Sequence, residues 1–199
     1  MTAISRLLPV FALICASLLS SSLLSGGTLT GAVVTSQYYA YGEPYVGLGS
    51  PASFVSDGSV QQTFCSVCGV GFTLSITENQ VIYQFIGGGT WDASEPSYTE
   101  GGLYIESGNL LTFADFLITD VSIDPASTVV GFDLSDLTYN SSRIAVNLAG
   151  LSLPGEPTLI LNVNGDRAVV PEPTAGLFVL GGFMGVWLLR RRAKAQNAA

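Results

Sequence analysis

The chain has 199 residues, a formal net charge of −8 and no histidine. The lack of histidine excludes Ser-His-Asp and Cys-His nucleophile systems and the usual zinc hydrolases. Residues 28–170 hold 14 of the 15 acidic side chains and only two basic ones, so this region has a net charge of −12. Because such an acidic domain repels phosphate groups, we expect no nucleic acid partner.

Residues 1–27 predict an export signal peptide with a helical apolar segment. Arg6 supplies a positive start, the run Leu7–Leu24 is mostly apolar, and small residues follow it. The small residues allow cleavage after Gly27 or after Ala32, and the pattern does not choose between them. An uncleaved N-terminal membrane anchor is the alternative.

Residues 28–60 are rich in glycine, serine and tyrosine, which predicts irregular strands and loops. Two cysteines follow, Cys65 and Cys68, with two residues between them. In an oxidising compartment this pair is expected to form a structural disulfide, with paired free thiols as the alternative. A zinc site would need further cysteine or histidine ligands, so the pair does not predict one.

The next segment has the clearest strand signals. Residues Phe72–Ile76 alternate between apolar and polar side chains, and Val81–Ile86 is almost wholly apolar. Because the gap between them is short, the two runs predict a β-hairpin. The loop 90–102 that follows contains Trp91, which could stack on a sugar ring or could instead plug the edge of the fold.

Further short strands are expected down to residue 163, separated by turns rich in glycine, proline and asparagine. They are Leu103–Glu106, Leu117–Ile123, Val129–Leu134, Arg143–Leu148 and Leu159–Val163, with a single helical turn suggested at Ala114–Leu117. Many short strands at regular spacing predict an all-β, antiparallel, jelly-roll-like β-sandwich over residues 28–168.

No catalytic residues are expected. Paired carboxylates could hydrolyse glycosides, but Asp92 with Glu95, or Asp133 with Asp136, are candidates by proximity in sequence alone. Calcium could bind to loop carboxylates, for which the candidates are Asp120, Asp124, Asp133 and Asp136. Because such pairs arise by chance among 14 acidic residues, we expect no enzyme. Because no Asp-x-Asp-x-Asp-Gly loop occurs, we expect no resident cofactor, and calcium stays an alternative.

The C-terminal segment predicts a short transmembrane helix. Residues Ala175–Leu189 carry no charge, and Arg190, Arg191 and Arg192 follow them. Fifteen helical residues cover only ~22 Å of a hydrocarbon core that is ~30 Å thick. Because basic clusters stay on the cytoplasmic side, everything before Pro171 is expected outside the cytoplasm.

The sequence Pro171-Glu172-Pro173, the short glycine-bearing apolar helix and the arginine cluster occur in this order at the C-terminus. Residues 169–194 thereby resemble the PEP-CTERM sorting domain. The resemblance implies a Gram-negative exported protein whose tail is processed by an exosortase, a transpeptidase-like membrane enzyme. It would be held transiently in the inner membrane and then pass to the cell envelope or extracellular matrix.

For the exported domain we expect a non-enzymatic binding or structural role in extracellular polysaccharide or biofilm. One alternative is a carbohydrate-binding module that uses Trp91 and the tyrosines as stacking groups. Others are a plain tail-anchored envelope protein and a glycosidase with paired acids.

Overall fold

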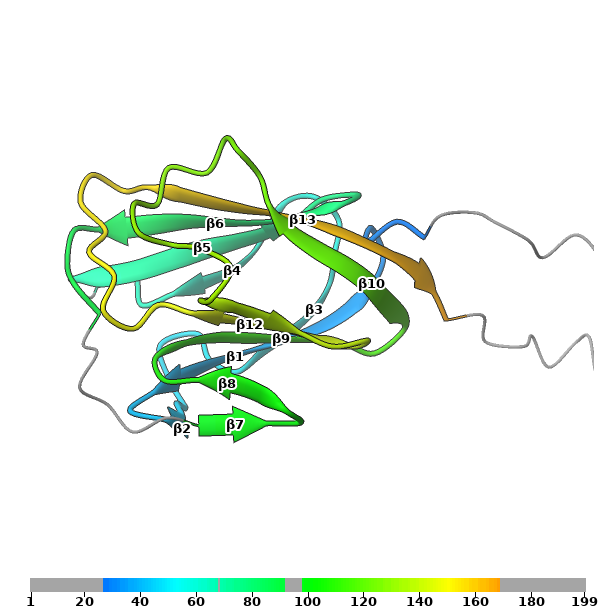
Figure 1. The fold of residues 1–199 in the computed structure, drawn as a ribbon, viewed down its shortest axis with the longest axis horizontal. Coiled ribbons are helices and arrows are strands. Elements are labelled where there is room, and N and C mark those ends of the chain that lie inside the picture. The colour runs from blue at the N-terminus through cyan, green and yellow to red at the C-terminus, as the bar shows by residue number, and fades with distance from the viewer. Residues whose placement is uncertain (1–26, 68, 92–97, 169–199) are drawn as a thin grey trace, which may run out of the picture. The chain divides into compact units, whose positions relative to one another are not determined.

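The computed structural model describes residues 27–67, 69–91 and 98–168. Within these ranges the chain forms strands, turns and loops, and no helix (Figure 1), which confirms the all-β prediction. None of these residues therefore belongs to a helix that could cross a bilayer. Residues Met1–Arg167 form one compact unit and Ala168–Ala199 a second. The predicted apolar signal segment and the sorting segment, residues 169–194, lie outside the described ranges.

Thirteen strands are present in the described residues. They are β1 (Val33–Ala40), β2 (Glu43–Pro44), β3 (Ala52–Val55), β4 (Val60–Phe64), β5 (Val70–Ile76), β6 (Gln80–Gly87), β7 (Tyr98–Glu100), β8 (Leu103–Ile105), β9 (Gly108–Phe113), β10 (Phe116–Ile123), β11 (Leu137–Tyr139), β12 (Arg143–Asn147) and β13 (Thr158–Arg167).

The strands form two antiparallel sheets and a small ribbon. The first sheet has the order β11-β12-β9-β1-β2, and β3 also pairs with β1. The second sheet has the order β10-β13-β6-β5-β4, and β7 pairs only with β8. One apolar core takes side chains from both sheets, among them Leu111 and Val146 from the first and Phe72 and Leu161 from the second. This arrangement is consistent with the predicted β-sandwich.

The predicted hairpin is present. Strands β5 and β6 pair along their whole length, with Phe72 opposite Phe85 and Ile76 opposite Val81. In β5 the apolar residues of the alternating pattern are buried, as a strand with one core-facing side requires. Strands β8, β10, β12 and β13 likewise occur where the pattern predicted strands.

Two predicted elements are wrong. The run Val129–Leu134 forms turns and irregular backbone, with a turn at Val130 and Gly131. Val130 and Leu134 are 80% and 67% exposed, so only part of this apolar run reaches the core. Ala114–Leu117 forms no helical turn, because the chain bends after Ala114 and enters β10 at Phe116.

Strand β9 was missed because it begins with residues that usually mark turns. Gly108 lies beside β12, and a Cβ atom there would collide with the carbonyl oxygen of Val146. The glycine therefore permits a close approach of two strands. Asn109 is fully buried, and its side chain bonds to Ser36 Oγ and to Tyr83 Oη, each at 3.0 Å. Gly108 and Asn109 thus contact strands that are distant from them in the sequence.

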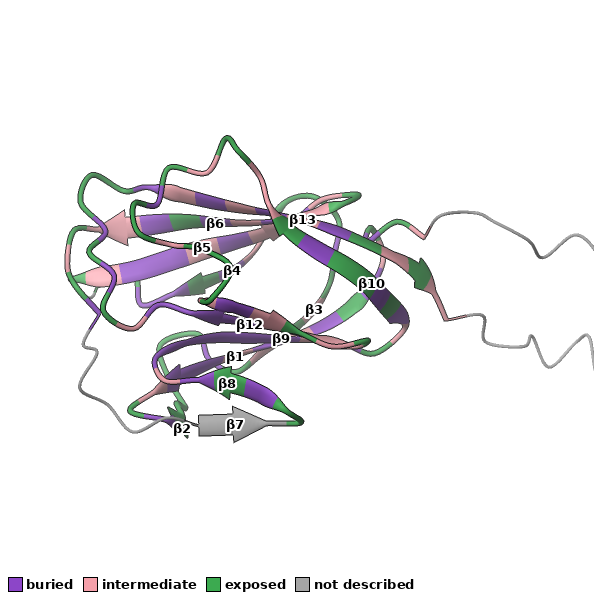
Figure 2. Ribbon diagram, in the orientation of Figure 1, coloured by how far each residue is buried: buried purple, intermediate pink, exposed green. Residues whose placement is uncertain are grey.

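Strand β8 gives the first sheet a second buried face. A small apolar cluster on that side unites Tyr39, Leu103, Ile105, Leu110 and Ala145. Four consecutive residues of β12 are buried, so both faces of this strand carry buried side chains (Figure 2). The physical reason is that β8 packs against β12 on the side away from the main core.

Candidate functional site

Trp91 is a buried residue at the edge of the sandwich. Its indole is 7% exposed and lies edge-on to Phe85, with 5.8 Å between ring centroids. Its Nε1–H donates to Tyr38 Oη, and its backbone N–H donates to the carbonyl oxygen of Leu151 at 3.0 Å. Most of the side chain is therefore packed against other residues of the domain. Trp91 thus belongs to the main core cluster, and its role as a sugar-stacking residue stays a prediction.

A pocket of about 240 Å³ lies against Trp91. Its lining combines aromatic, aliphatic and hydroxyl side chains, from Tyr38, Ala40, Tyr41, Val70, Thr90, Trp91 and Ser107. Apolar surface with a few convergent polar groups is typical of small-molecule sites. The pocket is the candidate site that a sugar-binding role would use.

Tyr41 is the exposed aromatic residue of this pocket. It is 63% exposed and occupies the two-residue turn between β1 and β2 together with Gly42. The φ angles are 57° at Tyr41 and 72° at Gly42, the pattern of a type I′ turn. A bulky side chain at positive φ is uncommon and costs free energy, and such residues cluster at functional sites. The local sequence Tyr-Gly lacks the usual Asn-Gly or Asp-Gly turn signal, so the turn was not predicted.

The tyrosines of the N-terminal region separate into two groups. Tyr38 and Tyr39 are buried, whereas Tyr41 and Tyr45 reach the surface. Tyr38 stacks on Phe64 with centroids 4.1 Å apart, and Tyr45 lies edge-on to both rings. Burial raises the pKa of Tyr38 above its usual value, while the hydrogen bond that its hydroxyl accepts from Trp91 acts in the opposite direction. The buried rings of Tyr38 and Phe64 therefore hold the ring of Tyr45 in place.

The predicted acidic pair Asp133 and Asp136 stabilises a surface turn. Asp133 accepts hydrogen bonds from the backbone and hydroxyl of Ser135, at 2.7 and 2.6 Å, and these lower its pKa. Asp136 accepts the Asp133 backbone N–H at 3.0 Å, while burial raises its pKa. Such hydrogen bonds are typical of side chains that stabilise a turn. The other predicted pair, Asp92 with Glu95, lies outside the described residues.

The remaining calcium candidates also bond to protein donors. Asp124 accepts from the Ala126 backbone at 2.8 Å, from Asn162 at 3.0 Å and from Gln80 at 3.2 Å, and these bonds lower its pKa. Asp120 accepts from Tyr139 at 3.3 Å. Nowhere in the described part of the chain do three carboxylate, histidine or cysteine side chains gather as a metal-binding group.

Cys65 is buried and disulfide-bonded. Its predicted partner, Cys68, lies outside the described residues, as do Pro171, Glu172, Pro173 and the arginine cluster Arg190–Arg192.

Comparison with protein-family models, with curated proteins and with solved structures gave no match to this chain.

Proposed function

We propose that this chain is an exported protein of the cell envelope or extracellular matrix. In this proposal an exosortase-like enzyme processes its C-terminus, and a jelly-roll-like β-sandwich performs a non-enzymatic binding or structural role in extracellular polysaccharide. The export signal and the sorting segment are the parts that imply this route.

One structural observation carries the proposal. The last described strand, β13, ends at Arg167, and the second compact unit begins at Ala168, three residues before Pro171. All thirteen described strands therefore precede the sorting motif. Cleavage near Pro171 would leave all of these strands, and the pairings among them, in the retained part of the chain, as a detachable sorting segment requires. The strongly acidic domain would remain soluble in a hydrated matrix.

The intact mass of the mature protein tests the proposal. We expect material recovered from the envelope or medium of a Gram-negative host with an exosortase to lack the residues that follow the Pro171 region. A Pro171→Ala, Pro173→Ala double variant should retain them and stay in the membrane fraction. If all wild-type protein retains residues 174–199, the tail-anchored alternative replaces this proposal.

The pocket beside Trp91 favours a second function, a carbohydrate-binding module. The strained, exposed Tyr41 on its rim is the observation that supports it, because tyrosine presents a large face at low entropic cost. The pair Asp133 and Asp136 gives a glycosidase no such support, since both side chains hydrogen-bond within their own turn.

Glycan arrays with Tyr41→Ala test this second function. Loss of one aromatic stacking contact is expected to weaken glycan binding by roughly 2- to 12-fold, with little change in stability. Tyr139→Ala is the matched control, because Tyr139 is exposed but does not line the pocket. Equal weakening by both variants, or no glycan signal from the wild type, would count against the module.

A further inference from the structure

The turn that precedes β1 belongs to the sandwich. Leu29 is fully buried in the main core, and its backbone N–H donates to the carbonyl oxygen of Glu78 at 2.7 Å. The Ala32 N–H donates back to the Leu29 carbonyl at 2.8 Å, which closes a four-residue turn. Gly31 has a φ of 81° at the third position, where a type II turn requires a positive value. The ordered fold thus begins upstream of β1.

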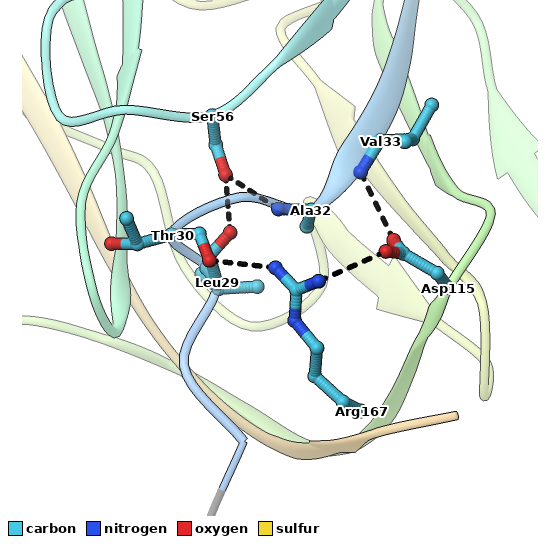
Figure 3. Close-up of polar contacts among 7 residues, drawn as sticks. All are labelled: Leu29, Thr30, Ala32, Val33, Ser56, Asp115 and Arg167. Carbon is cyan, nitrogen blue, oxygen red and sulfur yellow. Dashed lines mark hydrogen bonds and ion pairs between the residues drawn. The ribbon is translucent and has the colours of Figure 1, made fainter. Parts of the chain in front are cut away.

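Ser56 closes this turn from one side (Figure 3). Its hydroxyl donates to the Leu29 carbonyl and accepts the Ala32 N–H at 3.1 Å. Its carbonyl oxygen accepts the Gly31 N–H at 2.6 Å, and its own N–H donates to the Ala32 carbonyl at 3.0 Å. Ser56 is buried, so loss of the turn would leave its hydrogen-bonding groups without these partners.

Arg167 closes the turn from the other side (Figure 3). Its Nη2 donates to the Thr30 carbonyl oxygen at 2.6 Å, and its Nη1 forms an ion pair with Asp115 at 3.1 Å. Asp115 also accepts the Val33 N–H at 3.0 Å. The last residue of β13 is therefore bound to the turn directly and to the start of β1 through Asp115. Gly27 is linked to the same end of the domain, since its N–H donates to the Gly165 carbonyl at 3.1 Å.

From this geometry we infer that the export signal is removed between Gly27 and Thr28 and not after Ala32. The inference rests on the proposed export. Cleavage after Ala32 would remove the buried Leu29 side chain, the Arg167 acceptor on Thr30 and the partners of Ser56. Among the hydrogen bonds of the described residues, cleavage after Gly27 would remove the one from Gly27 to Gly165, and the exposed Thr28 would become the first residue.

The chemistry is hydrolysis by a membrane-bound signal peptidase. The amide bond between the Gly27 carbonyl carbon and the Thr28 nitrogen breaks. Water supplies the oxygen of the new Gly27 carboxylate and a proton to the new Thr28 amine. The retained residues Thr28–Ala32 then complete the turn that Ser56 and Arg167 hold.

N-terminal sequencing and intact mass of the exported full-length gene product test the inference. We expect a mature chain that starts at Thr28. A chain that starts at Val33, five residues shorter, would overturn the inference while leaving export intact. Retention of Met1–Gly27 on all of the protein would overturn export itself and this inference with it, so the two failures differ in mass.

A pair of proline variants of the full chain gives an independent readout. Proline lacks the amide N–H and has a fixed φ, which makes the preceding bond a poor substrate for a peptidase that binds an extended backbone. In pulse-labelled cells, Thr28→Pro is expected to slow conversion of precursor to mature protein at least 10-fold. Val33→Pro, the matched change at the other bond, should leave conversion at the wild-type rate. The reverse result would contradict the inference, and neither readout depends on the stability of the folded product.

Discussion

Replacement of Trp91 by alanine is expected to lower the free energy of unfolding by about 3–5 kcal/mol. The indole is buried in the main core against Phe85, and its Nε1–H bonds to Tyr38, so truncation leaves a cavity and removes a hydrogen bond. Urea unfolding of the exported protein, followed by circular dichroism, measures the change. Because whole domains are stable by only about 5–15 kcal/mol, the loss is large enough to reduce yield.

Two variants serve as controls for Trp91→Ala. Trp91→Phe keeps an apolar ring but not the Nε1–H donor, and should cost less than the alanine variant. Tyr41→Ala removes an exposed side chain and should change stability by less than about 0.5 kcal/mol. A Trp91→Ala variant as stable as the wild type would contradict the packing described for this residue.

The burial of Trp91 also decides how sugar binding can be tested. A loss of glycan signal in Trp91→Ala would follow from a damaged fold whether or not the pocket binds a sugar. Tyr41 lines the same pocket but lies at the surface. Its replacement therefore separates a loss of binding from a loss of structure.

Replacement of Asn109 by aspartate is expected to destabilise the fold by about 3–5 kcal/mol at pH 7. Asn109 is fully buried between the sheets, where its Nδ2 donates to Tyr83 Oη and Ser36 Oγ. An aspartate would place a carboxyl there, and desolvation would raise its pKa. The same burial raises the pKa of Tyr83 well above its usual value.

The destabilisation by Asn109→Asp should depend on pH in a defined direction. The carboxyl has a raised pKa in the folded state and an ordinary pKa of about 3.9 in the unfolded state. The unfolded chain therefore releases its proton first, and stability falls as the pH rises above about 4, by up to about 1.4 kcal/mol per pH unit. Below about pH 4 this penalty is absent.

Unfolding curves at a series of pH values, compared with the wild type at each pH, measure this penalty. Asn79→Asp is the matched control, because Asn79 is exposed in the turn between β5 and β6. Its difference from the wild type should be small and nearly constant with pH. A pH-independent difference for Asn109→Asp would contradict the desolvated setting of this position.

The amino-acid sequence alone determined the elements whose signal is local. The alternation in Phe72–Ile76 and the apolar run Val81–Ile86 predicted a hairpin that the structure contains. Both signals, the two-residue period of the side chains and the short gap between the runs, come from residues close together in the chain. The lack of histidine likewise excludes catalytic systems that need an imidazole, and the acidic composition predicts that there is no nucleic acid partner. The sorting segment is also a prediction from sequence, and it stays one.

The tertiary structure decided every feature that depends on residues far apart in the chain. Gly108 and Asn109 lie in a strand because Val146, Ser36 and Tyr83 meet them across the fold. Trp91 is buried because the partners that enclose it, such as Tyr38, come from distant strands. A short stretch of sequence shows the polarity of its residues and their periodicity. It does not show which distant residues pack against it, so these partners could not be predicted from it.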